Sequence, residues 1–336
     1  MYRYMSIEFI HNQKILGKRA KKGHSKDKPL VLVILGPTAS GKTSLAVKLA
    51  AKYQGEIISA DSRQVFRGMD IGTGKDLGEY KVNGKKIPYH LIDVVNPNDE
   101  FDLAKYQKLA NLAIKDILSR GKLPIIAGGT GLYLQALVDG YKLDKNVPDK
   151  QKRLELEAMS VAELYKKLET IKPDFTHKLN NSDKNNPRRL IRYLEIADQE
   201  DSSKKSLFKP KKEPAYDFII LGLQQNDDEM RSRIMKRITD RLDNEDMVGE
   251  VERLLDEGVS SERLNSFGLE YRHINWYLQD KLDYDEMIEK LSLATYRFAK
   301  RQKTWFRRWE KQGIKINWVE SLAEAEKILK HKLVNR

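Results

Sequence analysis

The sequence predicts an α/β protein: a P-loop, parallel-sheet core with a helical insertion domain. Three observations predict this fold, namely a continuous apolar run at 30–35, a glycine-rich loop at 36–43 and a helical pattern at 44–53. An apolar run rich in β-branched residues, without polar alternation, is typical of a strand buried on both faces of a parallel sheet. The strand–loop–helix order is the context that a phosphate-binding loop requires.

The remaining elements continue the alternation of strands and helices. Further strands are expected at 56–59, 90–94, 122–127 and 217–223. A helix is expected from Asp102 to Arg120, where Gly121 can adopt the left-handed conformation that ends helices. Strands that alternate with helices predict a mostly parallel sheet with helices on both faces.

The organisation along the chain has three parts. Residues 1–29 are basic and lack periodicity, which predicts a disordered tail. Residues 30–140 and 206–336 are expected to form the catalytic core. Residues 141–205 are polar and helical without a convincing strand, and they are expected to form the insertion domain. From residue 227 onward the pattern is largely helical.

Composition narrows the classes of function. The chain of 336 residues has a formal net charge of +13, which favours an anionic partner such as nucleic acid over a merely soluble basic surface. It has no cysteine, which excludes disulfides, thiolate metal sites and cysteine nucleophiles and fits a cytoplasmic location. No apolar run reaches the roughly 18 residues of a membrane helix, so no membrane partner is expected.

The motif at 36–43 carries specific chemistry. It fits G-x-x-x-x-G-K-[ST], and its residues are Gly36, Pro37, Thr38, Ala39, Ser40, Gly41, Lys42 and Thr43. The glycines allow backbone N–H groups to surround a phosphate at a helix N-terminus. The lysine supplies a positive charge to the outer phosphate, and the threonine hydroxyl is suited to Mg²⁺. The motif predicts phosphate binding but does not specify the reaction.

Two other loops follow strands of the predicted sheet, at the end where ligands bind in open α/β folds. Asp61 follows the second strand and is either a general base or a helix cap, with Arg63 and Gln64 able to contact a polar ligand. The loop at 128–131 either approaches a substrate through its backbone or is a tight turn. Asp93 is a candidate for the aspartate that holds Mg²⁺ in nucleoside triphosphatases.

Seven blocks together resemble the tRNA dimethylallyltransferases, also called tRNA isopentenyltransferases. They occur in the family's order between about residues 30 and 310, at 36–43, 59–66, 68–73, 89–93, 128–133, 187–192 and 299–306. The P-loop spelling Gly-Pro-Thr-Ala-Ser-Gly-Lys-Thr is itself characteristic. The family commonly has Ala where Gly74 stands and Pro where Asp76 stands, and Tyr296 occupies a position where Arg is usual.

The resemblance implies transfer of a dimethylallyl group from dimethylallyl diphosphate to the N6 amine of the adenosine next to the anticodon of tRNA. The P-loop would hold the diphosphate, with Mg²⁺ at Thr43. By family analogy Asp61 accepts the proton from the amine. Lys42, Arg233 and Thr130 would stabilise the diphosphate as it leaves.

The resemblance also implies an RNA-binding surface on a monomeric enzyme. Ser62, Arg63 and Gln64, beside Asp61, are expected at the extruded adenine and its neighbour. Contacts to the anticodon stem-loop are expected from Arg188, Arg189, Lys300, Arg301 and Gln302. The helical spacing of Leu291, Phe298, Trp305 and Trp309 predicts that these apolar side chains pack in the core.

Three other activities are consistent with parts of the pattern. An adenylate isopentenyltransferase would use a free nucleotide as acceptor, and a small-molecule kinase would turn over ATP at the P-loop. A nucleic-acid-binding protein could carry a P-loop that does not catalyse. The net charge, the helical insertion and the block at 300–302 favour an RNA acceptor.

Overall fold

The computed structural model describes residues 28–141, 143, 149–199 and 214–334. The chain forms two compact units, one of Met1–Gly140 with Glu213–Arg336 and one of Tyr141–Lys212. The helical insertion that the sequence predicts, at 141–205, falls within the second unit. The predicted tail at 1–29 lies outside the described residues except for its last two positions.

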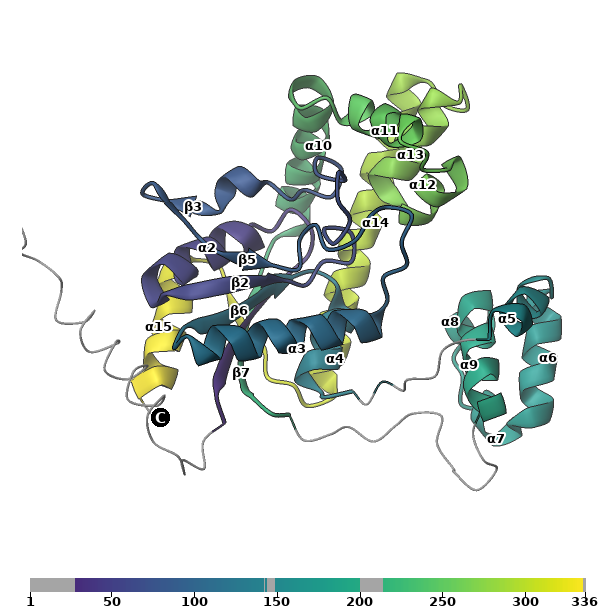
Figure 1. The fold of residues 1–336 in the computed structure, drawn as a ribbon, viewed down its shortest axis with the longest axis horizontal. Coiled ribbons are helices and arrows are strands. Elements are labelled where there is room, and N and C mark those ends of the chain that lie inside the picture. The colour runs from purple at the N-terminus through teal and green to yellow at the C-terminus, as the bar shows by residue number, and fades with distance from the viewer. Residues whose placement is uncertain (1–27, 142, 144–148, 200–213, 335–336) are drawn as a thin grey trace, which may run out of the picture. The chain divides into compact units, whose positions relative to one another are not determined.

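A parallel sheet forms the centre of the first unit (Figure 1). Its strand order is β5-β2-β6-β1-β7-β8, and every adjacent pair is parallel. The strands are β1 (Leu30–Leu35), β2 (Gly55–Ser59), β5 (Tyr89–His90), β6 (Leu123–Gly128), β7 (Asp217–Leu223) and β8 (Asn317–Val319). This arrangement confirms the predicted α/β fold class.

Helices cover both faces of this sheet, because successive side chains of each strand point to opposite faces. Leu30, Leu32 and Ile34 of β1 pack with α2 (Lys42–Tyr53) and α15 (Leu322–Val334). The intervening side chains of β1 pack with α3 (Leu103–Ser119), α4 (Gly131–Val138) and the C-terminal half of α14 (Tyr284–Lys311). The core is therefore divided into two layers by the sheet.

A third apolar cluster lies among the helices that follow β7. It combines residues of α10 (Asp227–Asn244), α11 (Met247–Asp256), α12 (Ser261–Phe267), α13 (Leu269–Leu278) and the N-terminal half of α14. Val65, Phe66 and Met69, from the segment after β2, belong to the same cluster. A short 3₁₀ helix, η1 (Leu77–Glu79), and the two-stranded hairpin of β3 (Lys81–Val82) and β4 (Lys85–Lys86) follow this segment.

The second unit has its own core. Its helices are α5 (Lys150–Glu157), α6 (Val161–Ile171), α7 (Pro173–Thr176), α8 (Asn181–Lys184) and α9 (Pro187–Gln199). Leu164 and Leu168 of α6 pack against Leu190 and Leu194 of α9. Ser160 and Glu163 form a reciprocal capping box at the start of α6, which satisfies two backbone donors of that helix.

Two predictions about the sheet are wrong in part. The strand expected at 90–94 ends at His90, because Leu91 and Asp93 have positive φ angles of 63° and 56°. The carboxylate of Asp93 pairs with buried Lys75, so Asp93 is not placed as a magnesium ligand. The strand β8 was not predicted, because three residues are too few to show a period against the helical pattern around them.

A buried carboxylate lies near the N-terminal end of β2, at the end of the sheet opposite the P-loop. Glu56 of β2 is 2% exposed and accepts hydrogen bonds from Arg120 Nη2 and Lys122 Nζ, both at 2.7 Å, with His90 Nε2 at 2.8 Å. The guanidinium of Arg120, followed by Lys122 and His90, lowers the pKa of Glu56 far below its usual range despite burial. A carboxyl group with a lowered folded-state pKa stabilises the fold above its unfolded pKa, and this contribution is lost as the pH falls.

Replacement of Glu56 by Gln should therefore destabilise the protein by about 2 kcal/mol at neutral pH, since charged hydrogen bonds are lost. The difference from the unmodified protein should shrink as the pH falls below about 4, because the glutamate of the unfolded chain is then protonated while the folded carboxylate stays charged. Urea unfolding between pH 7 and pH 3 measures this. Glu326→Gln is the matched control, because Glu326 pairs with Lys52 and is more exposed than Glu56. This variant should change the free energy of unfolding by less than about 1 kcal/mol. Equal effects of the two variants would contradict the assignment.

Candidate active site

The P-loop joins β1 to α2 and has the backbone of a phosphate-binding loop. Ala39 and Gly41 have positive φ angles of 60° and 83°. A Cβ atom on Gly36 would lie 2.8 Å from Ser40 Oγ and 3.2 Å from Leu223 Cβ, so the loop closes tightly on the neighbouring strand. The helix α2 begins at Lys42, which places its N-terminus and its partial positive charge at the loop.

A cavity of about 290 Å³ opens beside this loop. Its walls come from the P-loop, the end of β2, the segment before η1, the end of β6, and the helices α10 and α14. The lining residues are Thr38, Ala39, Ser40, Gly41, Lys42, Thr43, Ser44, Asp61, Gln64, Thr73, Gly74, Asp76, Glu79, Tyr80, Ala127, Gly128, Gly129, Arg233, Arg237, Phe298 and Gln302. The parallel sheet brings these segments together because the carboxyl ends of its strands share one edge.

The ammonium of Lys42 is held within this cavity. Its Nζ donates a hydrogen bond to the carbonyl of Pro37 at 2.6 Å. Burial and, secondarily, the positive charge of Arg237 lower the pKa of Lys42 to about 8, and Asp61 opposes this shift. A cation whose charged form is disfavoured by burial is favoured again when an anion binds beside it. The geometry and the charge both fit a diphosphate.

A second, half-buried cation lies at the same loop. The Nη2 of Arg237, on α10, donates a hydrogen bond to Thr38 Oγ1 at 2.6 Å. Burial and the nearby Arg241 lower the pKa of Arg237 to about 10. Within the described part of the chain, Arg237 Nε and Ser40 Oγ are buried without a hydrogen-bond partner. These two unpaired groups add to the donors that an anion in the cavity could use.

Sequence reasoning selected Arg233 rather than Arg237. The two arginines are four residues apart on α10 and therefore lie on the same face of the helix. Arg233 is more exposed and lines the cavity, whereas Arg237 contacts the P-loop directly. The arginine repeat of α10 was visible in the sequence, but which arginine reaches the loop depends on where the helix crosses it.

The loop after β2 presents Asp61 to the cavity. Asp61 Oδ1 accepts hydrogen bonds from the backbone N–H groups of Arg63 at 2.8 Å and Gln64 at 3.4 Å. The carboxylate therefore caps a turn rather than a helix and also lines the cavity, and its role as a general base stays a prediction. The hydroxyl of Thr130 accepts a hydrogen bond from the Ser62 N–H at 3.1 Å. Thr130 thus contacts the Asp61 loop, whereas the resemblance implies a contact with the diphosphate.

Two glutamines have buried amides at this site. Gln64 receives a hydrogen bond from Ser59 Oγ at 2.8 Å and donates one to the Gly74 carbonyl at 2.9 Å. Gln302 accepts from the Thr38 N–H at 2.8 Å and donates to the Gly129 carbonyl at 2.9 Å. Sequence reasoning placed Gln302 among the contacts to RNA, but at 7% exposure its amide bridges the two glycine loops.

Of the other basic residues expected to contact RNA, Arg63 contacts neighbouring protein groups and the rest are exposed. Arg63 donates to the Ser266 carbonyl at 3.3 Å and lies over the ring of Phe267. Lys300 and Arg301 are exposed on α14. Arg188 and Arg189 are exposed at the start of α9 in the second unit, where Arg189 pairs with Asp183.

The apolar residues of α14 that were expected in the core lie there, with the exception of Phe298. Leu291 and Trp309 are buried, and Trp305 is half-buried against the core. Phe298, which the spacing predicts to be a core residue, instead contributes to the cavity wall. It thus supplies an apolar surface beside the charged P-loop.

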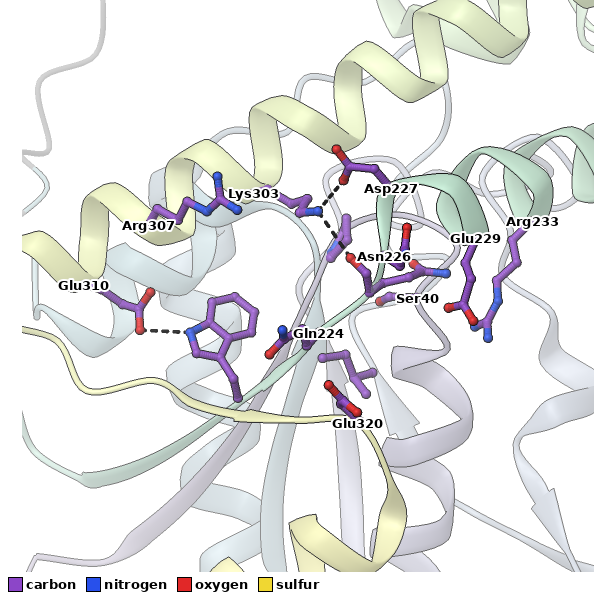
Figure 2. A pocket seen from close by; sticks show the side chains of 14 residues that line it. Ser40, Gln224, Asn226, Asp227, Glu229, Arg233, Lys303, Arg307, Glu310 and Glu320 are labelled. Atoms are coloured by element: carbon purple, nitrogen blue, oxygen red, sulfur yellow. Dashed lines mark hydrogen bonds and ion pairs between the residues drawn. The ribbon is translucent and has the colours of Figure 1, made fainter.

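A second, larger cavity of about 850 Å³ lies on the other side of Ser40 and Arg233 (Figure 2). Figure 2 shows Lys303 directed toward Asp227, which its Nζ meets at 2.5 Å, and Glu310 accepting a hydrogen bond from the Trp318 indole at 2.9 Å. Gln225 also lines this cavity. No sequence signal indicated this cavity, because its walls combine β7, α14 and the segment around β8.

The residues present determine how a metal could be held. Across the described residues, no group of three or more His, Cys, Asp or Glu side chains could hold a metal ion. Thr43 lines the P-loop cavity, and its hydroxyl would suit Mg²⁺, an ion that retains several waters and prefers phosphate oxygens. The donor set fits an ion that is carried mainly by the substrate.

In the same described ranges, no helix is long and apolar enough to span a bilayer.

The fold and this cavity define a P-loop α/β protein in which the phosphate-binding loop and an acidic side chain line one cavity. Residues 64–309 match the model of the IPP transferase family. The chain therefore belongs to the IPP transferase family.

Relatives agree over most of the chain. It is 46% identical over 291 residues to tRNA dimethylallyltransferase 1 of Syntrophus aciditrophicus, covering 86% of this chain and 93% of the relative. The corresponding protein of Geotalea daltonii is 45% identical over 305 residues, covering 90% and 95%.

Solved structures show the same similarity. The full-length tRNA isopentenylpyrophosphate transferase of Bacillus halodurans has a TM-score of 0.63 at 33% identity, with 92% of this chain and 98% of the other covered. A eukaryotic dimethylallyltransferase acting on tRNA has a TM-score of 0.72 at 27% identity, with 88% and 75% covered.

The lowered pKa of Lys42 predicts a pH dependence of diphosphate binding. If the charged ammonium is required, affinity for inorganic diphosphate should fall about tenfold between pH 7 and pH 9, as a group with pKa near 8 loses its proton. Isothermal titration calorimetry with magnesium present measures this. Lys42→Met should bind weakly and lack this part of the pH dependence, which separates it from the titration of the ligand. Lys48→Met, on the exposed face of α2, should behave as the unmodified protein. A pH profile shared by all three proteins would contradict the role of Lys42.

Proposed function

We propose that the protein transfers a dimethylallyl group from dimethylallyl diphosphate to the N6 amine of the adenosine on the 3′ side of the anticodon in tRNA. The observation that carries this proposal is one cavity that holds the P-loop cations on one side and the Asp61 carboxylate on the other. Family membership supports the reaction class. The same cavity also supports Asp61, Lys42, Thr43 and Arg237 as the residues that act.

The P-loop side of the cavity suits the donor. Lys42 and Arg237 would hold the diphosphate, with backbone donors of the loop around it. Mg²⁺ bound by the diphosphate and Thr43 would neutralise part of the phosphate charge. Phe298 would contact the apolar prenyl chain. Because allylic diphosphates ionise readily, stabilising the departing diphosphate supplies much of the catalysis.

The Asp61 side suits the acceptor. The N6 amine attacks the allylic carbon, a new C–N bond forms as the C–O bond to diphosphate breaks, and the amine proton passes to Asp61. Hydrogen bonds from Arg63 and Gln64 hold Asp61 in place for this transfer. Gln64, beside Asp61 on the cavity wall, would contact the extruded adenine.

Asp61→Asn tests this assignment, because the amide keeps the shape of the turn but is a far weaker base. The rate of transfer to an anticodon stem-loop should fall by a factor of about 10² to 10⁴. Affinity for the stem-loop should stay within about threefold, since a single contact of a large interface changes. Mass spectrometry of the nucleosides measures prenylated adenosine, and filter binding measures affinity.

Asp116→Asn, an exposed carboxylate of α3, is the matched control and should retain full activity. If Asp61→Asn retained the rate of transfer, Asp61 would not be the general base. Transfer to AMP but not to the stem-loop by the unmodified protein would instead identify an adenylate isopentenyltransferase. ATP turnover without use of dimethylallyl diphosphate would identify a kinase.

The basic residues of the insertion unit and of α14 would contact the phosphates of the tRNA backbone. The protein would bind this tRNA as a monomer. Arg188 and Arg189 at the start of α9, with Lys300 and Arg301 on α14, are exposed and can reach phosphates. Such contacts release counterions, which makes affinity depend on salt.

Arg188→Ala should weaken stem-loop binding and reduce the slope of log affinity against log salt by about 0.7 to 0.9, the value for one phosphate contact. Fluorescence anisotropy across a salt series measures the slope. Lys115→Ala on α3 removes one exposed charge of the first unit and should leave the slope unchanged. An Arg188→Ala slope equal to that of the unmodified protein would show that this arginine does not contact phosphate.

A further inference from the structure

One buried carboxylate outside the cavity receives four hydrogen bonds. Glu250, on α11, is 1% exposed. Its Oε2 accepts from the backbone N–H groups of Asp70 and Ile71, both at 2.7 Å. Its Oε1 accepts from the Gly72 N–H at 3.0 Å and from the Tyr271 hydroxyl at 2.7 Å. A single side chain thus holds three consecutive amides of one loop.

Those amides belong to the segment that continues into the cavity wall. The carbonyls of Asp70 and Ile71 accept from the N–H groups of Lys75 and Gly74, at 3.1 and 3.0 Å, so the loop folds back on itself. Thr73, Gly74 and Asp76 then line the cavity. The Gly74 carbonyl also fixes the amide of Gln64, which lies beside Asp61.

The loop also packs closely against the helices that hold it. A Cβ atom on Gly72 would lie 2.8 Å from the Tyr271 ring, and one on Gly74 would lie 2.5 Å from Arg241 Nη2. Arg241, which is 3% exposed, also meets both carboxylate oxygens of Asp76 at 3.2 Å. The loop is therefore held from α11 by Glu250, from α13 by Tyr271 and from α10 by Arg241.

We propose that Glu250 is a positioning residue for the acceptor side of the active site, acting through the 70–76 loop and Gln64. This inference rests on the proposed function for the identity of the acceptor. Glu250 does not line the cavity, so it affects the reaction only by setting the position of that wall. The P-loop side, which holds the donor, is built from other segments.

Glu250→Gln tests the proposal. An amide can accept only through its oxygen, and its NH₂ group would face N–H donors, so at least one donor loses its partner. The KM for an anticodon stem-loop should rise about tenfold or more, in keeping with the loss of charged hydrogen bonds that order the loop. The KM for dimethylallyl diphosphate should stay within about twofold. A merely destabilised protein would instead lose kcat with both KM values unchanged, because fewer molecules would be active.

Matched variants keep the test decisive. Glu252→Gln makes the same chemical change two residues away on the exposed side of α11 and should leave both KM values unchanged. Tyr271→Phe keeps the ring against Gly72 and removes one donor, so it should raise the KM for the stem-loop in the same direction by a smaller factor. If Glu250→Gln does not fold, this variant carries the test. Equal KM values for the unmodified protein and these site variants would overturn the proposal.

Amide hydrogen exchange separates this inference from the proposed function. Exchange at Asp70, Ile71 and Gly72 should be slow in the unmodified protein and in Glu252→Gln, and faster in Glu250→Gln. This readout does not depend on any substrate. Fast exchange at these amides in all three proteins would overturn the positioning role, whereas failure of the unmodified protein to prenylate RNA would overturn the proposed function alone.

Discussion

The bridge made by Gln302 connects the two glycine loops of the site to the longest helix of the protein. Its amide oxygen accepts from the P-loop at Thr38, and its nitrogen donates to Gly129. A Cβ atom on Gly129 would lie 2.3 Å from that nitrogen, and one on Gly131 would lie 2.4 Å from the Trp305 ring. Gly129 and Gly131 are therefore required by the close approach of α14 rather than by a turn alone.

This bridge explains why a single helix can organise the cavity. The C-terminal half of α14 packs under the sheet through Phe306 and Trp309, and its N-terminal half packs with α10 to α13. Between these two regions, Gln302 and Phe298 face the cavity. The helix thus fixes the P-loop, the loop at 128–131 and the helical region that carries Glu250 with respect to one another (Figure 1).

The elements with a strong period could be predicted from the sequence, and those set by tertiary contacts could not. The strand at 217–223 was predicted with the bounds observed, since it is continuous and apolar. The sequence pattern also identified the P-loop, whose chemistry is local. Arg237, the bridging role of Gln302 and the contact of Thr130 with Ser62 depend on which helix face or loop reaches the site. Likewise, Leu91 and Asp93 adopt positive φ angles because the chain turns there toward Lys75, a long-range effect that strand propensity does not contain.

The charges around the cavity show how the protein accommodates several cations close together. Arg237 and Arg241 lie near Glu270. Burial raises the pKa of Glu270, and the charges of these two arginines oppose that shift. Asp76 meets Arg241 on the other side. Carboxylates therefore offset part of the free-energy cost of burying the charges of the two arginines. For Lys42, the unfavourable effect of burial is seen in its lowered pKa. A diphosphate that enters the cavity meets donors already in position, so little of its binding energy is spent on rearranging the site.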